Sequence, residues 1–283
     1  IDPPESLLPP LLFYLHQQAA KNNASRSRQA EKALAKLIKA SPTVTLRDAL
    51  MEAVFNHDSA GNHAVLTLLG DFQPRSPQWQ QLLAVTANSS HLKTRMITAQ
   101  QLGRAASAAA AWSQAMQALL HDESTAVQEL AIDACGESGL ITEVCQQSLL
   151  NHLTAGNEDI RETAVAALGT LAETSAKSKL QESRRFSQTI AAAVAAAALK
   201  DRSDDVRMKA IGAYDSLTLQ PERIVELLLE VSLKEQQAYI ISHALTRLSH
   251  QGKHLTTGHK GQIRNLTTHT NPEVSRIAKL IVE

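Results

Sequence analysis

Apolar residues recur along the chain at two spacings, every four residues within a segment and every 33 residues between segments. The first segment carries Leu46, Leu50 and Val54. Residues four apart lie on one face of an α-helix, so the spacing predicts a helix with an apolar stripe. The stripe returns in the same register as Trp79/Leu83/Ala87, Trp112/Met116/Leu120 and Cys145/Leu149/Leu153.

A second apolar stripe follows each copy of the first. It is clearest at Val127/Ala131/Cys135 and Ile160/Ala164/Leu168, and weaker at Gly61/Val65/Leu69 and Thr94/Thr98/Leu102. Between the stripes lie short polar residues, which can cap the start of the second helix. Each repeat is therefore predicted to be a pair of helices. Because neither helix can bury its stripe alone, we expect the pairs to stack.

The period breaks once. From Leu168 to its next counterpart, Tyr214, the displacement is 46 residues rather than 33, which places about 13 extra residues between Gly169 and Ala191. Beyond this insertion the period resumes at 34 residues. The chain therefore divides into an N-terminal linker with degenerate capping helices (1–44), repeats 1–4 (45–172), the insertion (173–188) and repeats 5–7 (189–283), the last of which need not be complete.

The second helix begins with a characteristic run in two repeats, DRSDDVRMKA at residues 201–210 and NEDIRETAVAALG at residues 157–169. These runs resemble the Asp-x-x-Val-Arg-x-x-Ala-x-x-x-Leu-Gly pattern of the HEAT-repeat family, and the resemblance covers roughly residues 45–283. It implies an all-α fold, a right-handed α–α superhelix of the HEAT-like solenoid type. It implies little about function, because such solenoids have many unrelated roles.

Composition agrees with closely packed helices and narrows the functional classes. Aromatic residues make up only 3% of the chain, which disfavours a β-sandwich or barrel. Twenty-eight basic and 28 acidic residues give a formal net charge of zero, which argues against a general nucleic-acid binder. No apolar run approaches the roughly 20 residues that a membrane span needs. The sequence does not distinguish a cytoplasmic from an exported protein.

Three arginines occupy the same position, one residue after the start of the second stripe: Arg95, Arg161 and Arg207. The family resemblance implies that such a row is mostly structural and bonds across neighbouring repeats. Asp159 and Asp205 are the local partners we expect. In a nucleic-acid-binding protein the same row would contact phosphates, but the zero net charge argues against that alternative.

No catalytic, cofactor-binding or metal-binding residue is predicted. The eleven histidines show no diagnostic ligand spacing. Cys135 and Cys145 occupy apolar stripe positions on consecutive helices, so they are either small buried apolar residues or a disulfide, and the sequence does not decide between the two.

The insertion is the feature that the repeat pattern explains least. One interpretation is a lengthened, solvated connection or helix extension. The other is an element that contacts a partner, because it combines basic residues with an aromatic residue of the kind that anchors interfaces. The candidate contact residues are Lys177, Lys179, Arg184, Arg185 and Phe186.

The leading functional hypothesis is a non-enzymatic protein–protein interaction scaffold that uses the curved surface of the solenoid and needs no cofactor. Its partner would be another protein or another domain of the same polypeptide. One alternative is a HEAT-like DNA-binding glycosylase, which would need a basic concave face with aromatic residues on it. A further alternative is the helical part of a lipid-transfer protein, which would accompany large β-sheet domains.

The two ends of the chain suggest one domain of a longer protein. The first residue is Ile1 and the opening segment is rich in proline, like a linker. The final stripe, Val274/Ala278/Val282, has no closing polar helix after it. We therefore expect an uncovered apolar face there that further repeats, another domain or a second copy would cover.

Overall fold

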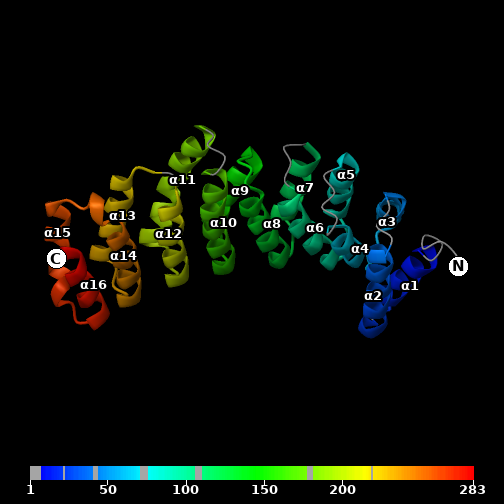
Figure 1. Cartoon of the computed structure of the whole chain (residues 1–283), viewed down its shortest axis with the longest axis horizontal. Coiled ribbons are helices and arrows are strands. Elements are labelled where there is room, and N and C mark those ends of the chain that lie inside the picture. Colours follow the sequence, from blue (N-terminus) through cyan, green and yellow to red (C-terminus); the bar gives the residue numbers. More distant parts are fainter. Residues whose placement is uncertain are drawn as a thin grey trace. The chain divides into compact units, whose positions relative to one another are not determined.

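The computed structural model describes residues 8–21, 23–40, 44–70, 76–105, 110–176, 181–217 and 219–283. Every regular element within these ranges is a helix (Figure 1). The chain divides into two units, Ile1–Cys145 and Gln146–Glu283, which are described separately. None of the described helices is long and apolar enough to cross a membrane.

Within its described residues, unit 1 contains four helix pairs and the start of α9. Its helices are α1 (Leu8–Ala20), α2 (Ala24–Ala40), α3 (Val44–Asn56), α4 (Asn62–Gly70), α5 (Pro77–Thr86), α6 (Leu92–Arg104), α7 (Ala110–Leu120), α8 (Thr125–Ser138) and α9 (Glu143–His152). The even-numbered helices are the second helices of the repeats. Within the unit α4 packs on α6 and α6 on α8, while α5 packs on α7.

Unit 2 continues the alternation. Its helices are α10 (Glu158–Ala176), α11 (Gln181–Lys200), α12 (Asp204–Ser216), α13 (Pro221–Lys234), α14 (Ala238–His250), α15 (Thr257–Ile263) and α16 (Pro272–Val282), with 3₁₀ turns η2 (Gly252–His254) and η3 (Arg264–Thr268). The second helices α10, α12, α14 and α16 pack in succession. Stacked two-helix repeats are therefore present in both units.

The two tryptophans belong to the core. Trp79 and Trp112 lie fully buried on the first-helix stripe, at the positions equivalent to Leu46. The indole Nε1 of Trp112 donates to the Leu102 carbonyl at 2.9 Å, so the polar atom of that ring is satisfied. Neither ring forms part of an exposed platform for a ligand.

Recurrent glycines let the second helices approach closely. A Cβ atom added at Gly103 would lie 3.0 Å from the Cα atom of Ala134, and one added at Gly169 would lie 3.1 Å from the Cα atom of Ala213. Both contacts are to the backbone of the next second helix, which cannot move aside as a flexible side chain can. The glycines are therefore packing residues and not parts of a phosphate-binding loop.

The insertion lengthens two helices. Residues 173–176 extend α10 and residues 181–188 begin α11, giving helices of 19 and 20 residues. Residues 177–180 lie outside the described part of the chain. Phe186 is only 2% exposed and lies four residues before the buried Ile190. Phe186 thus continues the apolar stripe of α11 into the core. We expected its side chain to be accessible to a partner, and it is not.

The final helix, α16, does not present an apolar stripe to solvent. Val274 and Ala278 are buried, because α16 packs on α14 and η3. The exposed surface of α16 carries Glu273, Arg276 and Lys279, and Leu280 is the large apolar side chain exposed among them. The expectation of an uncovered apolar face is therefore wrong for Val274 and Ala278, whereas Val282, the third residue of the stripe, is half-buried.

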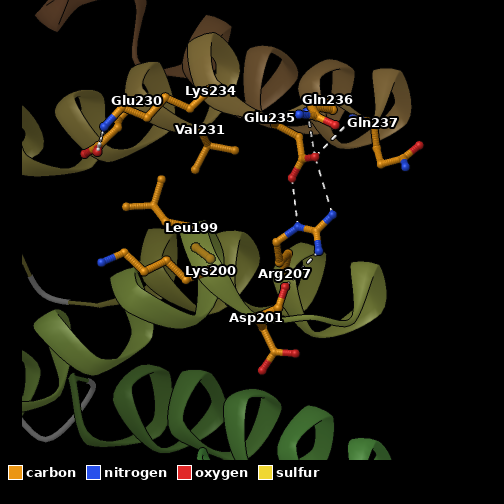
Figure 2. A pocket seen from close by; sticks show the side chains of 11 residues that line it. Leu199, Lys200, Asp201, Arg207, Glu230, Val231, Lys234, Glu235, Gln236 and Gln237 are labelled. Atoms are coloured by element: carbon orange, nitrogen blue, oxygen red, sulfur yellow. Dashed lines mark hydrogen bonds and ion pairs between the residues drawn. The ribbon is translucent and has the colours of Figure 1, made fainter.

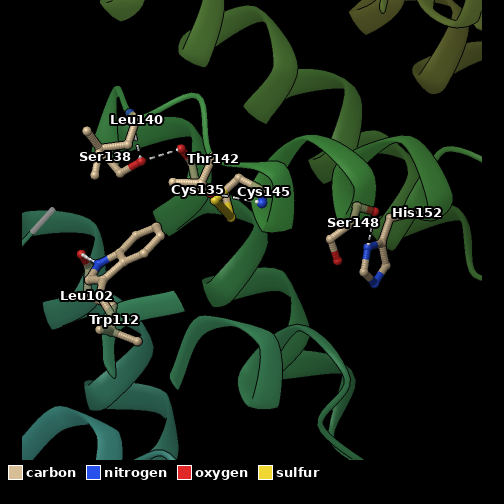
Figure 3. Close-up of a disulfide and its surroundings, with 9 residues drawn as sticks. All are labelled: Leu102, Trp112, Cys135, Ser138, Leu140, Thr142, Cys145, Ser148 and His152. Carbon is tan, nitrogen blue, oxygen red and sulfur yellow. Dashed lines mark hydrogen bonds between the residues drawn. A yellow bond between two sulfur atoms is a disulfide. The ribbon is translucent and has the colours of Figure 1, made fainter. Parts of the chain in front are cut away.

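The two cysteines form a disulfide (Figure 3). Cys135 lies near the end of α8 and Cys145 near the start of α9, with 5.6 Å between their Cα atoms, a distance typical of disulfides. Both residues are fully buried. The bond closes the α8–α9 connection, which the left-handed Gly139 opens with φ of 65°. Of the two alternatives that the sequence left open, the structure contains the disulfide.

Candidate functional surfaces

Three arginines at one helix position link each second helix to the turn of the following repeat. Arg161 of α10 has a side chain only 4% exposed. Its Nε and Nη2 atoms lie 2.9 and 2.8 Å from the two carboxylate oxygens of Asp201. Its Nη1 atom donates to the carbonyl of Ala155, six residues earlier, at 3.0 Å. The guanidinium is thus bound on both sides, and its carboxylate contact is bidentate.

Arg95 of α6 and Arg207 of α12 repeat this geometry. Arg95 pairs with Asp122 (Nε–Oδ2, 2.7 Å) and Arg207 with Glu235 (Nε–Oε2, 2.8 Å). In both, Nη1 also donates to a carbonyl six residues earlier, at 3.0 Å for Arg95 and 2.8 Å for Arg207. We call these three contacts the arginine ladder.

The carboxylates of the ladder are not the ones we expected. Arg161 pairs with Asp201 and not with Asp159, and Arg207 pairs with Glu235 and Asp204 and not with Asp205. The long side chain reaches forward to the following turn. There a carboxylate is already placed by the turn backbone, since Asp201 also accepts the backbone N–H of residue 203 at 2.9 Å.

Asp201 is ionised in the folded chain. Burial raises the pKa of its carboxyl, but hydrogen bonds from Arg161 and from the backbone of Ser203 outweigh burial and bring the pKa below its ordinary value. Each charge of this buried pair therefore has partners, as a buried pair requires.

The ladder position has a shorter polar residue in α4 and α8. Asn62 donates to the carbonyl of His57 at 2.6 Å, and Gln128 donates to the carbonyl of Asp122 at 2.7 Å. Both side chains reproduce the bond to the preceding turn and, being neutral, add no ion pair. This recurrent bond was not predicted from the sequence. The signal was a polar residue at the same position in five consecutive second helices.

The ladder does not offer a track for phosphates. Arg95 and Arg161 are buried, and all three guanidinium groups are paired with carboxylates of the chain. A phosphate could reach them only by displacing these partners. Arg95, Arg161 and Arg207, which occupy the same position in their repeats, therefore share one structural environment.

A groove of about 420 Å³ lies on the second helices of unit 2, between α10, α12 and α14. We call it the α10–α14 groove. Small residues line its centre: Ala166, Gly169, Gly212 and Ala213. Lys209 pairs with Glu162 of the same lining (3.5 Å), whereas Arg247 pairs with Asp215, which lies outside the lining (2.8 Å).

The α10–α14 groove also contains a half-buried histidine, His243. Burial and the neighbouring Arg247 lower the pKa of His243. The ring is therefore neutral at physiological pH. The lining also carries the carboxylates of Glu173 and Asp205, so acidic groups outnumber basic ones. A groove that combines small residues with these polar groups can receive an extended segment by close packing.

A smaller cavity, about 370 Å³, lies where α11 and α13 end (Figure 2). The Arg207–Glu235 contact of the ladder forms part of its wall, as Figure 2 shows. On its rim, Lys234 pairs with Glu230 at 2.6 Å. The polar groups that line this cavity serve mainly to join successive repeats.

A larger cavity, about 550 Å³, lies in unit 1 where α2, α4 and α6 begin. Its ionisable side chains are Arg28, Glu31, His63, His91 and Lys93. We call it the basic cavity. No group of three or more histidine, cysteine, aspartate or glutamate side chains that could hold a metal ion occurs in the described part of the chain.

The predicted contact residues of the insertion are placed only in part. Arg185 is exposed near the start of α11, whereas Phe186 is buried beside it. Lys177 and Lys179 lie outside the described residues, and so does the side chain of Arg184.

No protein-family model matches the chain, and no curated protein matches its sequence. Solved structures do match its fold. The karyopherin Kap121p, bound to the extreme C-terminus of the protein phosphatase Cdc14p, is similar over 96% of this chain and 33% of its own length, with 17% identity and a TM-score of 0.68. Kap95p, solved with RanGDP, is similar over 91% of this chain and 36% of its own, with 11% identity and a TM-score of 0.60.

An engineered protein is also similar, over 95% of this chain and 76% of its own, with 17% identity and a TM-score of 0.53. The chain thus spans about a third of the length of the karyopherin chains that it matches. At these identities the likeness shows the fold alone. The fold is that of an all-α, HEAT-like solenoid.

Proposed function

We propose that this chain is a non-enzymatic scaffold that binds another protein along the α10–α14 groove. The observation that carries the proposal is the groove itself, a continuous hollow across three successive second helices with a floor of small residues. Ala166 and Gly212 of this lining are partly exposed, so their small size leaves space on the groove surface for an incoming segment. Two of the Kap121p structures that share the fold have a protein bound, in one case the extreme C-terminus of Cdc14p and in the other Nup53p, which supports a protein as the partner.

The arrangement of the aromatic and basic residues favours this proposal over a DNA glycosylase. Such an enzyme would need aromatic residues and free arginines on its binding face. Here Trp79 and Trp112 are in the core, and Arg95 and Arg161 are paired with carboxylates. Arg185 at the start of α11 is a second proposed contact, together with Arg184, Lys177 and Lys179.

Site-specific crosslinking tests the proposal. A photoreactive amino acid at Met208, which lines the groove, is expected to yield a discrete protein adduct in an extract of the source cells. The same residue at Glu222, exposed on α13, should not yield that adduct. Nucleic-acid adducts from position 208, or equal yields from both positions, would contradict the proposal.

A blocking substitution adds a second readout. Ala166→Arg fills the groove with a long side chain at a partly exposed helical position, where arginine is a good helix former. It should abolish the adduct from position 208. Ala196→Arg, the same change at an exposed position of α11, is the matched control and should leave the adduct intact.

A further inference from the structure

Two cations of the basic cavity of unit 1, Arg28 and Lys93, have no carboxylate partner within the described part of the chain. Within the described residues, neither Arg28 nor Lys93 lies within 4.0 Å of a carboxylate. Both side chains are exposed at the rim. Unpaired cations at the mouth of a cavity attract a negatively charged group, and their attraction is not cancelled by the chain itself.

The acidic groups near the basic cavity only partly offset these cations. Glu31 lies 3.8 Å from the Nε2 atom of His63, whose Nδ1 atom faces the Ala60 carbonyl at 2.7 Å. Asp58 is fully engaged by the turn that precedes α6, where it accepts hydrogen bonds from Ser89 and Ser90. Burial raises the pKa of Asp58, but these hydrogen bonds and the nearby His91 bring it below its ordinary value.

The backbone adds to the positive potential. Three successive second helices, α2, α4 and α6, begin at this cavity, and the N-terminal end of a helix carries a partial positive charge. At α6 the N-cap residue His91 makes no side-chain capping bond. The first N–H groups of α6 therefore remain available beside Lys93.

The two unpaired cations come from two different helices. Arg28 belongs to α2 and Lys93 to α6, with α4 packed between these two helices. Packed helices lie about 8–10 Å apart, so the two cations belong to helices about 16–20 Å apart. A single phosphate needs donors that meet at one place. An extended chain that crosses helices at this separation places carboxylates about five or six residues apart beside them, at about 3.3 Å per residue.

We propose that the basic cavity binds an acidic, extended segment of a protein partner, with one carboxylate beside Arg28 and another beside Lys93 at the start of α6. Leu92, 45% exposed on the lining, supplies an apolar contact between them. The inference rests on the proposed scaffold function and names the chemistry of a second partner segment. Because Glu31 opposes the incoming charge, it weakens this interaction.

Binding of a fluorescent ten-residue peptide of alternating glutamate and leucine tests the proposal. Fluorescence anisotropy with the full chain should show saturable binding that weakens as salt is raised, since partly exposed charges are screened. The same peptide with glutamine in place of glutamate should not bind. Arg28→Ala combined with Lys93→Ala should weaken binding about tenfold or more, because two steering charges are lost.

Glu31→Gln gives a change of opposite sign. It removes the opposing charge and should tighten binding several-fold, an outcome that general damage to the fold cannot produce. Arg276→Ala combined with Lys279→Ala on α16 removes the same number of exposed cations elsewhere and should leave binding unchanged.

Three results would overturn the proposal: no binding of the acidic peptide, equal binding by the Arg28/Lys93 double variant, or displacement of the peptide by millimolar inorganic phosphate. The last would identify a site for a small anion. In each case the scaffold proposal is judged separately, because the adduct from Met208 depends on the α10–α14 groove and not on this cavity.

Discussion

Arg161 and Arg28 lie on second helices of different repeats, yet their charges serve different purposes. Arg161 is buried in the ladder, with its guanidinium divided between Asp201 and a backbone carbonyl. Arg28 is exposed at the basic cavity and has no carboxylate within ion-pair distance in the described chain. A cation that joins two repeats is not available to a partner, so a count of basic residues cannot locate a binding surface.

The burial of a cation also decides how much its loss destabilises the fold. Removing one member of a buried ion pair leaves the other charge without compensation in a poorly solvated place. Removing an exposed, unpaired cation leaves nothing behind. Removing an arginine of the ladder should therefore lower the free energy of unfolding. Removing a cation of the basic cavity should instead weaken binding and change the free energy of unfolding little.

The largest expected effect is that of Arg161→Ala. Asp201 would remain buried and charged without its bidentate partner, so we expect a loss of about 3–5 kcal/mol in the free energy of unfolding. Urea unfolding followed by far-ultraviolet circular dichroism measures the loss. Arg28→Ala is the matched control and should change the same quantity by less than about 0.5 kcal/mol. Equal effects of the two variants would remove the distinction between the two sets of cations.

Reduction of the disulfide should give the next largest effect. The disulfide lies in unit 1, which also contains the Arg95 contact of the ladder. Cys135 and Cys145 close a loop of separation 10, for which loop-closure entropy predicts about 2–3 kcal/mol. Both tryptophans, Trp79 and Trp112, lie in unit 1, so tryptophan fluorescence during urea unfolding follows this unit. The stabilisation by the disulfide should not change with salt concentration, unlike a contribution from exposed charges.

A control for reduction is the Cys135→Ala/Cys145→Ala variant, which lacks the disulfide in any buffer. Adding a reductant to it should have no further effect. If the reductant lowered its unfolding midpoint as much as that of the unmodified chain, the disulfide would not be the source of the stabilisation.

The fold was predictable because a two-helix repeat has a strong periodic signal. The stripe through Trp112 and Met116 and that through Val127 and Ala131 are buried as expected. Phe186 was misassigned although the signal existed, since Phe186, Ile190 and Val194 are four residues apart and continue one stripe. The change of period at the insertion obscured that register.

The chemistry of the surfaces was less predictable, for a physical reason. Asp201 and Arg161 are 40 residues apart in the sequence, whereas Arg95 and Asp122 are 27 residues apart. The insertion between Arg161 and Asp201 accounts for the difference. A local rule therefore selected the wrong carboxylate. The basic cavity combines residues of α2, α4 and α6, and the weak periodicity of residues 1–44 gave no register for Arg28.

A ladder contact consists of a hydrogen bond to the preceding turn and an ion pair with the following turn, and a smaller effect is expected for the hydrogen bond alone. Gln128 makes only the bond to the preceding turn, so Gln128→Ala should lower the free energy of unfolding by about 0.5–1.5 kcal/mol, the usual value for one hydrogen bond. Arg95→Ala removes the same bond and also leaves Asp122 unpaired, so its loss should exceed that of Gln128→Ala. Tryptophan fluorescence during urea unfolding measures both. A larger loss for Gln128→Ala would assign the main stabilisation to the backbone bond.

The smallest expected effect is a dependence of the ladder on pH. Burial raises the pKa of Asp201 in the folded chain, but the hydrogen bonds from Arg161 and from the backbone of Ser203, together with the charges of Arg161 and Arg202, outweigh burial and hold this pKa below the ordinary value of 3.8. A carboxyl with a depressed pKa stabilises the fold above its unfolded pKa, and this contribution is lost as pH falls through the folded pKa. Stability from this pair should thus be complete at neutral pH and should decline below about pH 4.

In Arg161→Ala the effect of burial on Asp201 is opposed less, so the pKa of its carboxyl should rise and the residue should accept a proton earlier as pH falls. Protonation removes the uncompensated charge that destabilises this variant. The difference in free energy of unfolding between the variant and the unmodified chain should therefore shrink as pH falls from about 6 to 3. Urea unfolding at several pH values measures it, and Arg28→Ala should show no such trend. A difference that stays constant over this range would mean that Arg161 stabilises the fold by packing and by its bond to the Ala155 carbonyl, and not through the charge of Asp201.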